Sequence, residues 1–185
     1  MSLDRPAFIA GLVAVLAAPS AKPAPSPSPA PSDDGPKICT HNSALPYDRP
    51  IGLKMRVLDG PQFSLVEHRG HPVLLVMFAT WCAPCNEEMP HIVNIAQSYE
   101  AAGLYTVAVN FREKDNPVRD FRKKFGITFP IAMDEDGAFT DVLQGGNGSI
   151  GIPSLLLIDK AGYLSCYTAG GLDEATLRDA IAKLL

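Results

Sequence analysis

The segment from Val73 to Cys85 reads VLLVMFATWCAPC, and the rest of the chain is organised around it. Its first seven residues are all apolar, which is typical of a buried β-strand. Beyond the segment, apolar residues recur at helical spacing from Met89 to Tyr99. The sequence therefore predicts that a C-x-x-C pair, Cys82 and Cys85, lies where a buried strand passes into a helix.

This position favours thiol chemistry at Cys82. Free backbone N–H groups and the helix dipole both stabilise a thiolate at a helix N-terminus, so we expect a lowered pKa for the Cys82 thiol. A lower pKa makes Cys82 a better leaving group in thiol exchange. Cys85 lies one turn further along, where we expect it to act as the resolving thiol. The interpretation is a redox-active Cys82–Cys85 disulfide that needs no other cofactor.

Metal binding and a structural disulfide are the other uses of a C-x-x-C pair. A zinc site needs two more ligands, and the chain has no second C-x-x-C and no H-x3-H. His91 would lie about 120° around the expected helix from Cys85, which is poor placement for a shared metal. We therefore expect no metal site, and a metal-binding chaperone that uses Cys82 and Cys85 is kept as an alternative.

A peroxiredoxin-like peroxidase is an alternative from another class. Such an enzyme would carry Thr or Ser three residues before its peroxidatic cysteine. The chain has Ala79 at that position, which disfavours peroxidase chemistry.

Composition points to one globular domain with a tail. The chain has 185 residues, of which 46% are hydrophobic and 19% charged. Its net charge of −4 offers no basic surface for nucleic acid, so we expect no nucleic-acid partner.

The N-terminal region differs from the rest in composition. The apolar run from Phe8 to Ala18 is too short for a comfortable membrane span and is typical of a secretory signal. We assign residues 1–21 to a signal peptide or short N-terminal anchor, 22–37 to a disordered Pro/Ala/Ser-rich linker and 38–185 to the folded domain. Contact with a membrane is expected only through that anchor.

The order of strand and helix patterns predicts the fold class. We expect strands at 55–58, 63–66, 73–79, 105–110, 154–159 and 163–168, an extended segment at 127–133, helices at 82–102, 116–125, 138–143 and 173–185, and a loop at 144–151. This order predicts an α/β fold with a central mixed β-sheet, flanking helices and an N-terminal β-hairpin.

Several short motifs carry a family resemblance. They are Asp59-Gly60, Phe63, Leu65, Phe78 to Cys85, Glu88-Met89-Pro90, Gly151-Ile152-Pro153 and Leu157-Ile158-Asp159. From about residue 50 to 185 the chain resembles the thioredoxin-like fold, and within it the TlpA/ResA/DsbE-type extracytoplasmic thiol–disulfide oxidoreductases. The resemblance implies a cis peptide bond before Pro153, which would pack beside the cysteine pair.

The same resemblance implies the residues that meet a substrate. The substrate-binding residues would be Trp81, Ala83, Pro84, Ile152 and Pro153. The Ile152 backbone would bind an extended substrate segment. Trp81 is interpreted as a lid beside the disulfide, with ordinary core packing as its alternative.

The family's acidic residue, three positions after the second cysteine, matches Glu88. Cys85 and Glu88 form an i, i+3 pair on the expected helix, whereas Glu87 points nearly the opposite way. We interpret Glu88 as the proton acceptor for Cys85. The alternative is an ordinary surface carboxylate.

Two further cysteines depart from the family pattern. Cys166 lies in a predicted strand and Cys39 precedes the fold, which makes an even count of four. A structural Cys39–Cys166 disulfide would join the N-terminal extension to the last strand. Two free thiols are the alternative, because sequence alone does not determine connectivity.

The resemblance implies an enzyme that reduces protein disulfides in the periplasm or another extracytoplasmic compartment. Its partners would be a protein disulfide substrate and a thiol–disulfide electron donor in the membrane. Cytochrome c maturation and copper-site assembly are the pathways that the family indicates.

Overall fold

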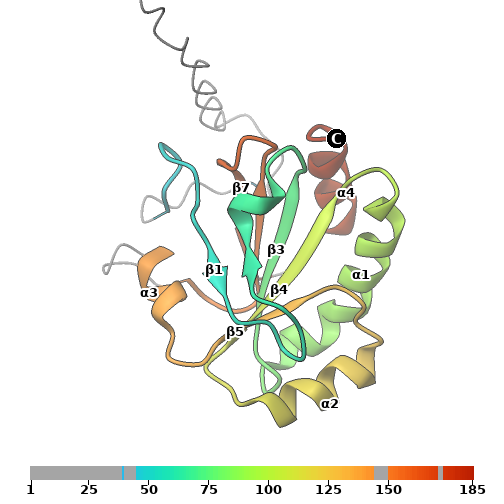
Figure 1. Cartoon of the computed structure of the whole chain (residues 1–185). Coiled ribbons are helices and arrows are strands. Elements are labelled where there is room, and N and C mark those ends of the chain that lie inside the picture. Colours follow the sequence, from blue (N-terminus) through green and yellow to red (C-terminus); the bar gives the residue numbers. More distant parts are fainter. Residues whose placement is uncertain (1–38, 40–44, 144–149, 171–172) are drawn as a thin grey trace, which may run out of the picture.

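The computed structural model describes residues 39, 45–143, 150–170 and 173–185 (Figure 1). The predicted signal or anchor, the linker and most of the predicted 144–151 loop lie outside the described residues. Within the described ranges, no helix is both long enough and apolar enough to cross a membrane.

A five-stranded mixed sheet, in the order β5-β4-β3-β6-β7, forms the centre of the molecule. The central strand β3 (Val73–Phe78) pairs in parallel with β4 (Tyr105–Phe111), which pairs in parallel with β5 (Ile131–Asp134). On its other side β3 pairs antiparallel with β6 (Ser154–Ile158), and β7 (Leu164–Ala169) is antiparallel to β6. The predicted α/β class with a mixed sheet is confirmed.

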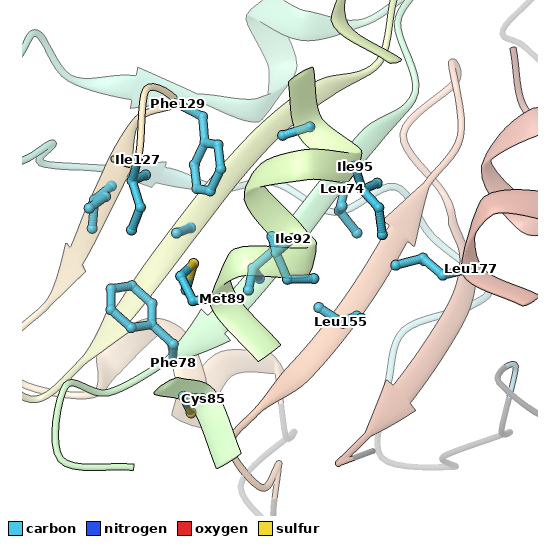
Figure 2. Close-up of a cluster of buried hydrophobic side chains, with 14 of the residues drawn as sticks. Leu74, Phe78, Cys85, Met89, Ile92, Ile95, Ile127, Phe129, Leu155 and Leu177 are labelled. Carbon is cyan, nitrogen blue, oxygen red and sulfur yellow. The ribbon is translucent and has the colours of Figure 1, made fainter. Parts of the chain in front are cut away.

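Three helices cover one face of this sheet (Figure 1). They are α1 (Ala83–Glu100), α2 (Asp115–Phe125) and α4 (Glu174–Ala182). Figure 2 shows their core, in which Met89 and Ile92 of α1 lie over the sheet and Cys85 lies at one end of the cluster.

The other face is covered by smaller elements. They are the hairpin of β1 (Lys54–Met55) and β2 (Phe63–Ser64), the 3-10 helix η1 (Leu65–His68) and α3 (Ala138–Leu143). Strand β3 is buried on both faces, since alternate side chains enter the two cores and none of its six residues is more than 2% exposed. That double burial explains the unbroken apolar run in the sequence.

Three predicted elements differ from those observed. The strand predicted at 55–58 is β1, which ends at Met55, and beyond it only Val57 pairs, in an isolated bridge. The strand predicted at 63–66 ends at Ser64, and the chain then turns into η1, where the Leu65 N–H donates to Leu53 O at 2.8 Å and its side chain is buried. The segment predicted only as extended, 127–133, overlaps β5, an added strand of the sheet. It pairs with β4 on one side, while Val57 forms an isolated bridge to Ala132 on the other.

Candidate active site

Cys82 is the N-cap residue of α1. Its backbone is extended, with φ −79° and ψ 110°, and its carbonyl accepts the Asn86 N–H at 3.1 Å. Its Sγ accepts the backbone N–H of Cys85 at 3.3 Å. A sulfur that receives a free N–H at a helix N-terminus is stabilised as a thiolate when the pair is reduced. Pro84 lies in the first turn, where backbone N–H groups have no acceptor within the helix, so its missing N–H costs no helical hydrogen bond.

Cys82 and Cys85 are joined by a disulfide, with their Cα atoms 5.2 Å apart. Cys82 is 6% exposed and Cys85 1%, so Cys82 is the outer member of the pair. An incoming thiol or disulfide meets Cys82 first.

Pro153 completes the surroundings of the pair. The peptide bond between Ile152 and Pro153 is cis, as the resemblance implied, and Pro153 lies just before β6. Pro153 and Cys85 line the same small cavity, so the structure brings together two residues 68 positions apart in the chain.

Glu88 lines that cavity as well. Its side chain is half-buried, whereas Glu87 is exposed. The structure therefore brings Glu88 and Cys85, one helical turn apart, to the same small cavity.

A groove on the surface continues from Glu88 to α4. It is lined by Glu87, Glu88, His91 and Glu174. His91 Nδ1 lies 2.9 Å from Glu174 Oε2 and so joins α1 to α4. Hydrogen bonds from Arg178 and then from His91 lower the pKa of Glu174 below the ordinary 4.5. The described part of the chain contains no cluster of three or more His, Cys, Asp or Glu side chains suited to a metal.

Trp81 is 66% exposed beside Cys82. Core packing, the alternative considered for this residue, is therefore wrong. Ala83 and Pro84 are exposed too, and Ile152 is half-buried. The exposed residues on either side of Cys82 in the sequence are therefore apolar.

Three residues that hold the loop before Cys82 were not predicted from the sequence. Glu113 binds the backbone and hydroxyl of Thr80, Asn110 binds Glu113, and the Asn86 amide spans Thr80 and Cys82. One signal was present in the sequence. The polar Asn110 lies at the end of an apolar strand, and the cysteine motif likewise follows the end of an apolar strand. In the parallel β3–β4 pair Asn110 lies opposite Phe78, at the C-terminal end of β3, and the two cysteines follow that end in the chain.

The other two cysteines are joined to each other. Cys39 and Cys166 form a disulfide, with Cα atoms 4.7 Å apart. Cys166 is 4% exposed in β7, and the pair packs against Leu157, against Ala180 of α4 and against Leu184, which follows α4. The bond therefore connects a residue that precedes the fold to an outer strand of the sheet.

The fold and the cysteine pair together define a class: the protein is a thiol–disulfide oxidoreductase with a thioredoxin-like fold. The Redoxin family model matches residues 28–184, so the chain belongs to that family. Within it, the chain is one of the TlpA/ResA/DsbE-type proteins, as its motifs indicated.

Individual relatives agree with this class. The thiol-disulfide oxidoreductase ResA of Geobacillus thermodenitrificans is 31% identical over 127 residues, which cover 69% of this chain and 71% of the relative. ResA of Bacillus cereus is 30% identical over the same length and coverage.

Solved structures agree as well. A thiol:disulfide interchange protein of the thioredoxin family from Chlorobium tepidum superimposes with a TM-score of 0.63 at 27% identity, over 74% of this chain and 97% of that one. StoA from Bacillus subtilis gives a TM-score of 0.60 at 25% identity, over 73% and 98%.

Proposed function

We propose that the protein reduces protein disulfides outside the cytoplasm through the Cys82–Cys85 pair. The observation that carries the proposal is the Cys85 N–H donated to Cys82 Sγ at the start of α1. It supports a thiolate on the outer sulfur, and a thiolate is the form that attacks a disulfide.

The reaction has two exchange steps. The Cys82 thiolate attacks one sulfur of the substrate disulfide, which forms a mixed disulfide and releases the other substrate sulfur as a thiolate that takes up a proton. The Cys85 sulfur then attacks Cys82, so the mixed disulfide breaks and the second substrate thiol leaves. The substrate gains two electrons and two protons, and the protein ends with the Cys82–Cys85 bond.

Glu88 would take the proton of Cys85 in the second step. Its support is the cavity that both side chains line. Glu88 would then give this proton to the second substrate sulfur, which leaves as a thiol.

The substrate would lie over the exposed surface of Trp81, Ala83 and Pro84. An extended segment would pair with the backbone at Ile152, beside the cis-proline.

A thiol donor must reduce the protein again before the next cycle. We infer that this donor is a membrane thiol–disulfide protein, which would act in a periplasmic or otherwise extracytoplasmic compartment. Cytochrome c maturation and copper-site assembly are the proposed settings, since both need cysteine thiols kept reduced where disulfides otherwise persist.

The redox potential of the Cys82–Cys85 couple tests this direction of electron flow. Equilibration with glutathione, followed by Trp81 fluorescence, should give a value near −250 mV or below, as for thioredoxin-type reductants. A value near −120 mV would make the protein an oxidant and contradict the proposal. Peroxide consumption by the reduced protein would favour a peroxidase, and stoichiometric metal binding would favour a chaperone.

A further inference from the structure

The loop before Cys82 is held by a carboxylate from the segment that follows β4. Glu113 Oε2 accepts the Thr80 backbone N–H at 2.7 Å, and Oε1 accepts the Thr80 hydroxyl at 2.5 Å. The Asn110 amide donates a third bond, from Nδ2 to Glu113 Oε2 at 2.7 Å. All three partners donate, which is the arrangement that an ionised carboxylate requires.

The backbone next to Glu113 adopts a strained conformation. Arg112 has a φ of +58°, in the left-handed region that residues other than glycine seldom occupy. Its N–H still donates to Asp134 O at 3.0 Å, so pairing at the edge of the sheet holds this turn. Strain of this kind persists where the position of a neighbouring group matters, and here that group is the Glu113 carboxylate.

Asn110 is oriented by the same carboxylate. The residue is fully buried at the end of β4, and its Oδ1 has no hydrogen-bond partner within the described protein. A buried amide oxygen without a partner costs free energy. The opposite orientation would place Oδ1 against Glu113, and two acceptors repel each other, so the donor faces Glu113.

The opposite side of the loop is held by a cationic group acting through an amide. Asn86 Nδ2 donates to Thr80 O and to Cys82 O, each at 2.9 Å. Lys124 Nζ donates to Asn86 Oδ1 at 2.9 Å. Both the N–H and the C=O of Thr80 are therefore bound, and Cys82 is only two residues further along the chain.

We propose that Glu113 is a positioning residue that anchors the loop from Thr80 to Cys82 and whose negative charge keeps the cysteine pair reducing. The inference rests on the proposed function. A nearby negative charge disfavours a second one on Cys82, and a less stable reduced form makes the couple a stronger reductant. Lys124 and the N-terminus of α1 act in the opposite sense, while Glu88 adds negative charge on the Cys85 side.

The test compares Glu113→Gln and Glu113→Asp with the parent in the full-length protein. Gln keeps the shape: its Oε1, in the place of Glu113 Oε2, still accepts from the Thr80 N–H and the Asn110 amide, while its Nε2 donates to the Thr80 hydroxyl. Asp shortens the side chain and keeps the charge. The readouts are the glutathione equilibrium, followed by Trp81 fluorescence, and the pH dependence of Cys82 alkylation.

We expect Glu113→Gln to shift the glutathione equilibrium threefold to tenfold toward the reduced protein, where tenfold equals about 30 mV. Alkylation of Cys82 should extend to lower pH. Glu113→Asp should stay close to the parent in both readouts. Glu67→Gln removes an exposed carboxylate before β3, at the opposite end of that strand, and serves as the matched control.

Glu113→Gln with the parent equilibrium and the parent alkylation profile would overturn the inference, as would a shift toward the oxidised protein. An equal shift in Glu67→Gln would overturn it too, because the loss of any carboxylate charge would then be enough to shift the equilibrium. A parent protein that exchanges no disulfides would instead contradict the proposed function, so the two failures are distinguishable.

Discussion

The two disulfides lie in the same hydrophobic core, on the helix-covered face of the sheet, yet their surroundings differ. The Cys82–Cys85 bond spans 3 positions, begins a helix and has exposed residues around its outer sulfur. The Cys39–Cys166 bond spans 127 positions and reaches the middle of β7, against α4. The comparison teaches that position decides the use of the bond: a helix terminus with access from outside favours exchange, and a strand beneath a helix favours a lasting cross-link.

The sharpest way to break this comparison is to remove each disulfide and measure activity. Cys82→Ser removes the attacking sulfur, so reduction of insulin disulfides should fall to the uncatalysed rate. The double variant Cys39→Ala/Cys166→Ala should keep most of the parent rate. Loss of activity in a folded double variant would show that the second bond takes part in the reaction.

The second prediction concerns Glu88, which lies beside the first disulfide. Glu88→Gln removes the proton acceptor and keeps the shape, so resolution of the mixed disulfide should slow by about 10²–10⁴. Attack by Cys82 should stay nearly unchanged. Stopped-flow Trp81 fluorescence with a model disulfide separates the two phases.

Glu87→Gln is the matched control for this variant, since the neighbouring carboxylate is exposed. Its two phases should match those of the parent. If Glu88→Gln matches the parent as well, Glu88 is a surface carboxylate without a role in resolution.

The third prediction compares the two disulfides in their effect on stability, where the larger effect is expected from the Cys39–Cys166 bond. Opening the 127-position cross-link with Cys39→Ala/Cys166→Ala should lower the free energy of unfolding by about 5 kcal/mol in the chain-entropy model. Opening the short Cys82–Cys85 loop should cost much less, because it constrains few residues of the unfolded chain. Urea unfolding of the oxidised variants measures both. Equal losses would remove the distinction between a reactive and a structural bond.

The smallest effect is expected at Glu174, which joins the helices beside the two disulfides. Its pKa is lowered by Arg178 and His91, so the folded state binds its proton less readily than the unfolded state. The stabilisation is present above the ordinary pKa of a glutamate and is lost as the pH falls through the lowered value. The urea midpoints of the parent and Glu174→Gln should differ near neutral pH and converge in acid. A constant difference would contradict the role of its charge.

Local patterns in the sequence were enough to predict the central part of the fold. The apolar run of β3 identified a strand buried on both faces, and helical spacing after it placed Cys82 at a helix start. These features depend on residues close together in the chain, so periodicity alone carries them. The extents of β1 and β2 and the existence of β5 were not predicted, because hydrogen bonds from distant segments decide where a short strand ends.

The sequence by itself determined the class of chemistry, since a C-x-x-C pair between a buried strand and a helix has few other uses. Only the tertiary structure decided which residues surround that pair. It placed Glu113 against Thr80, turned Trp81 outward and joined Cys39 to Cys166 across 127 positions. These are contacts between segments far apart in the chain, and they depend on the order and direction of the strands that bring the segments together.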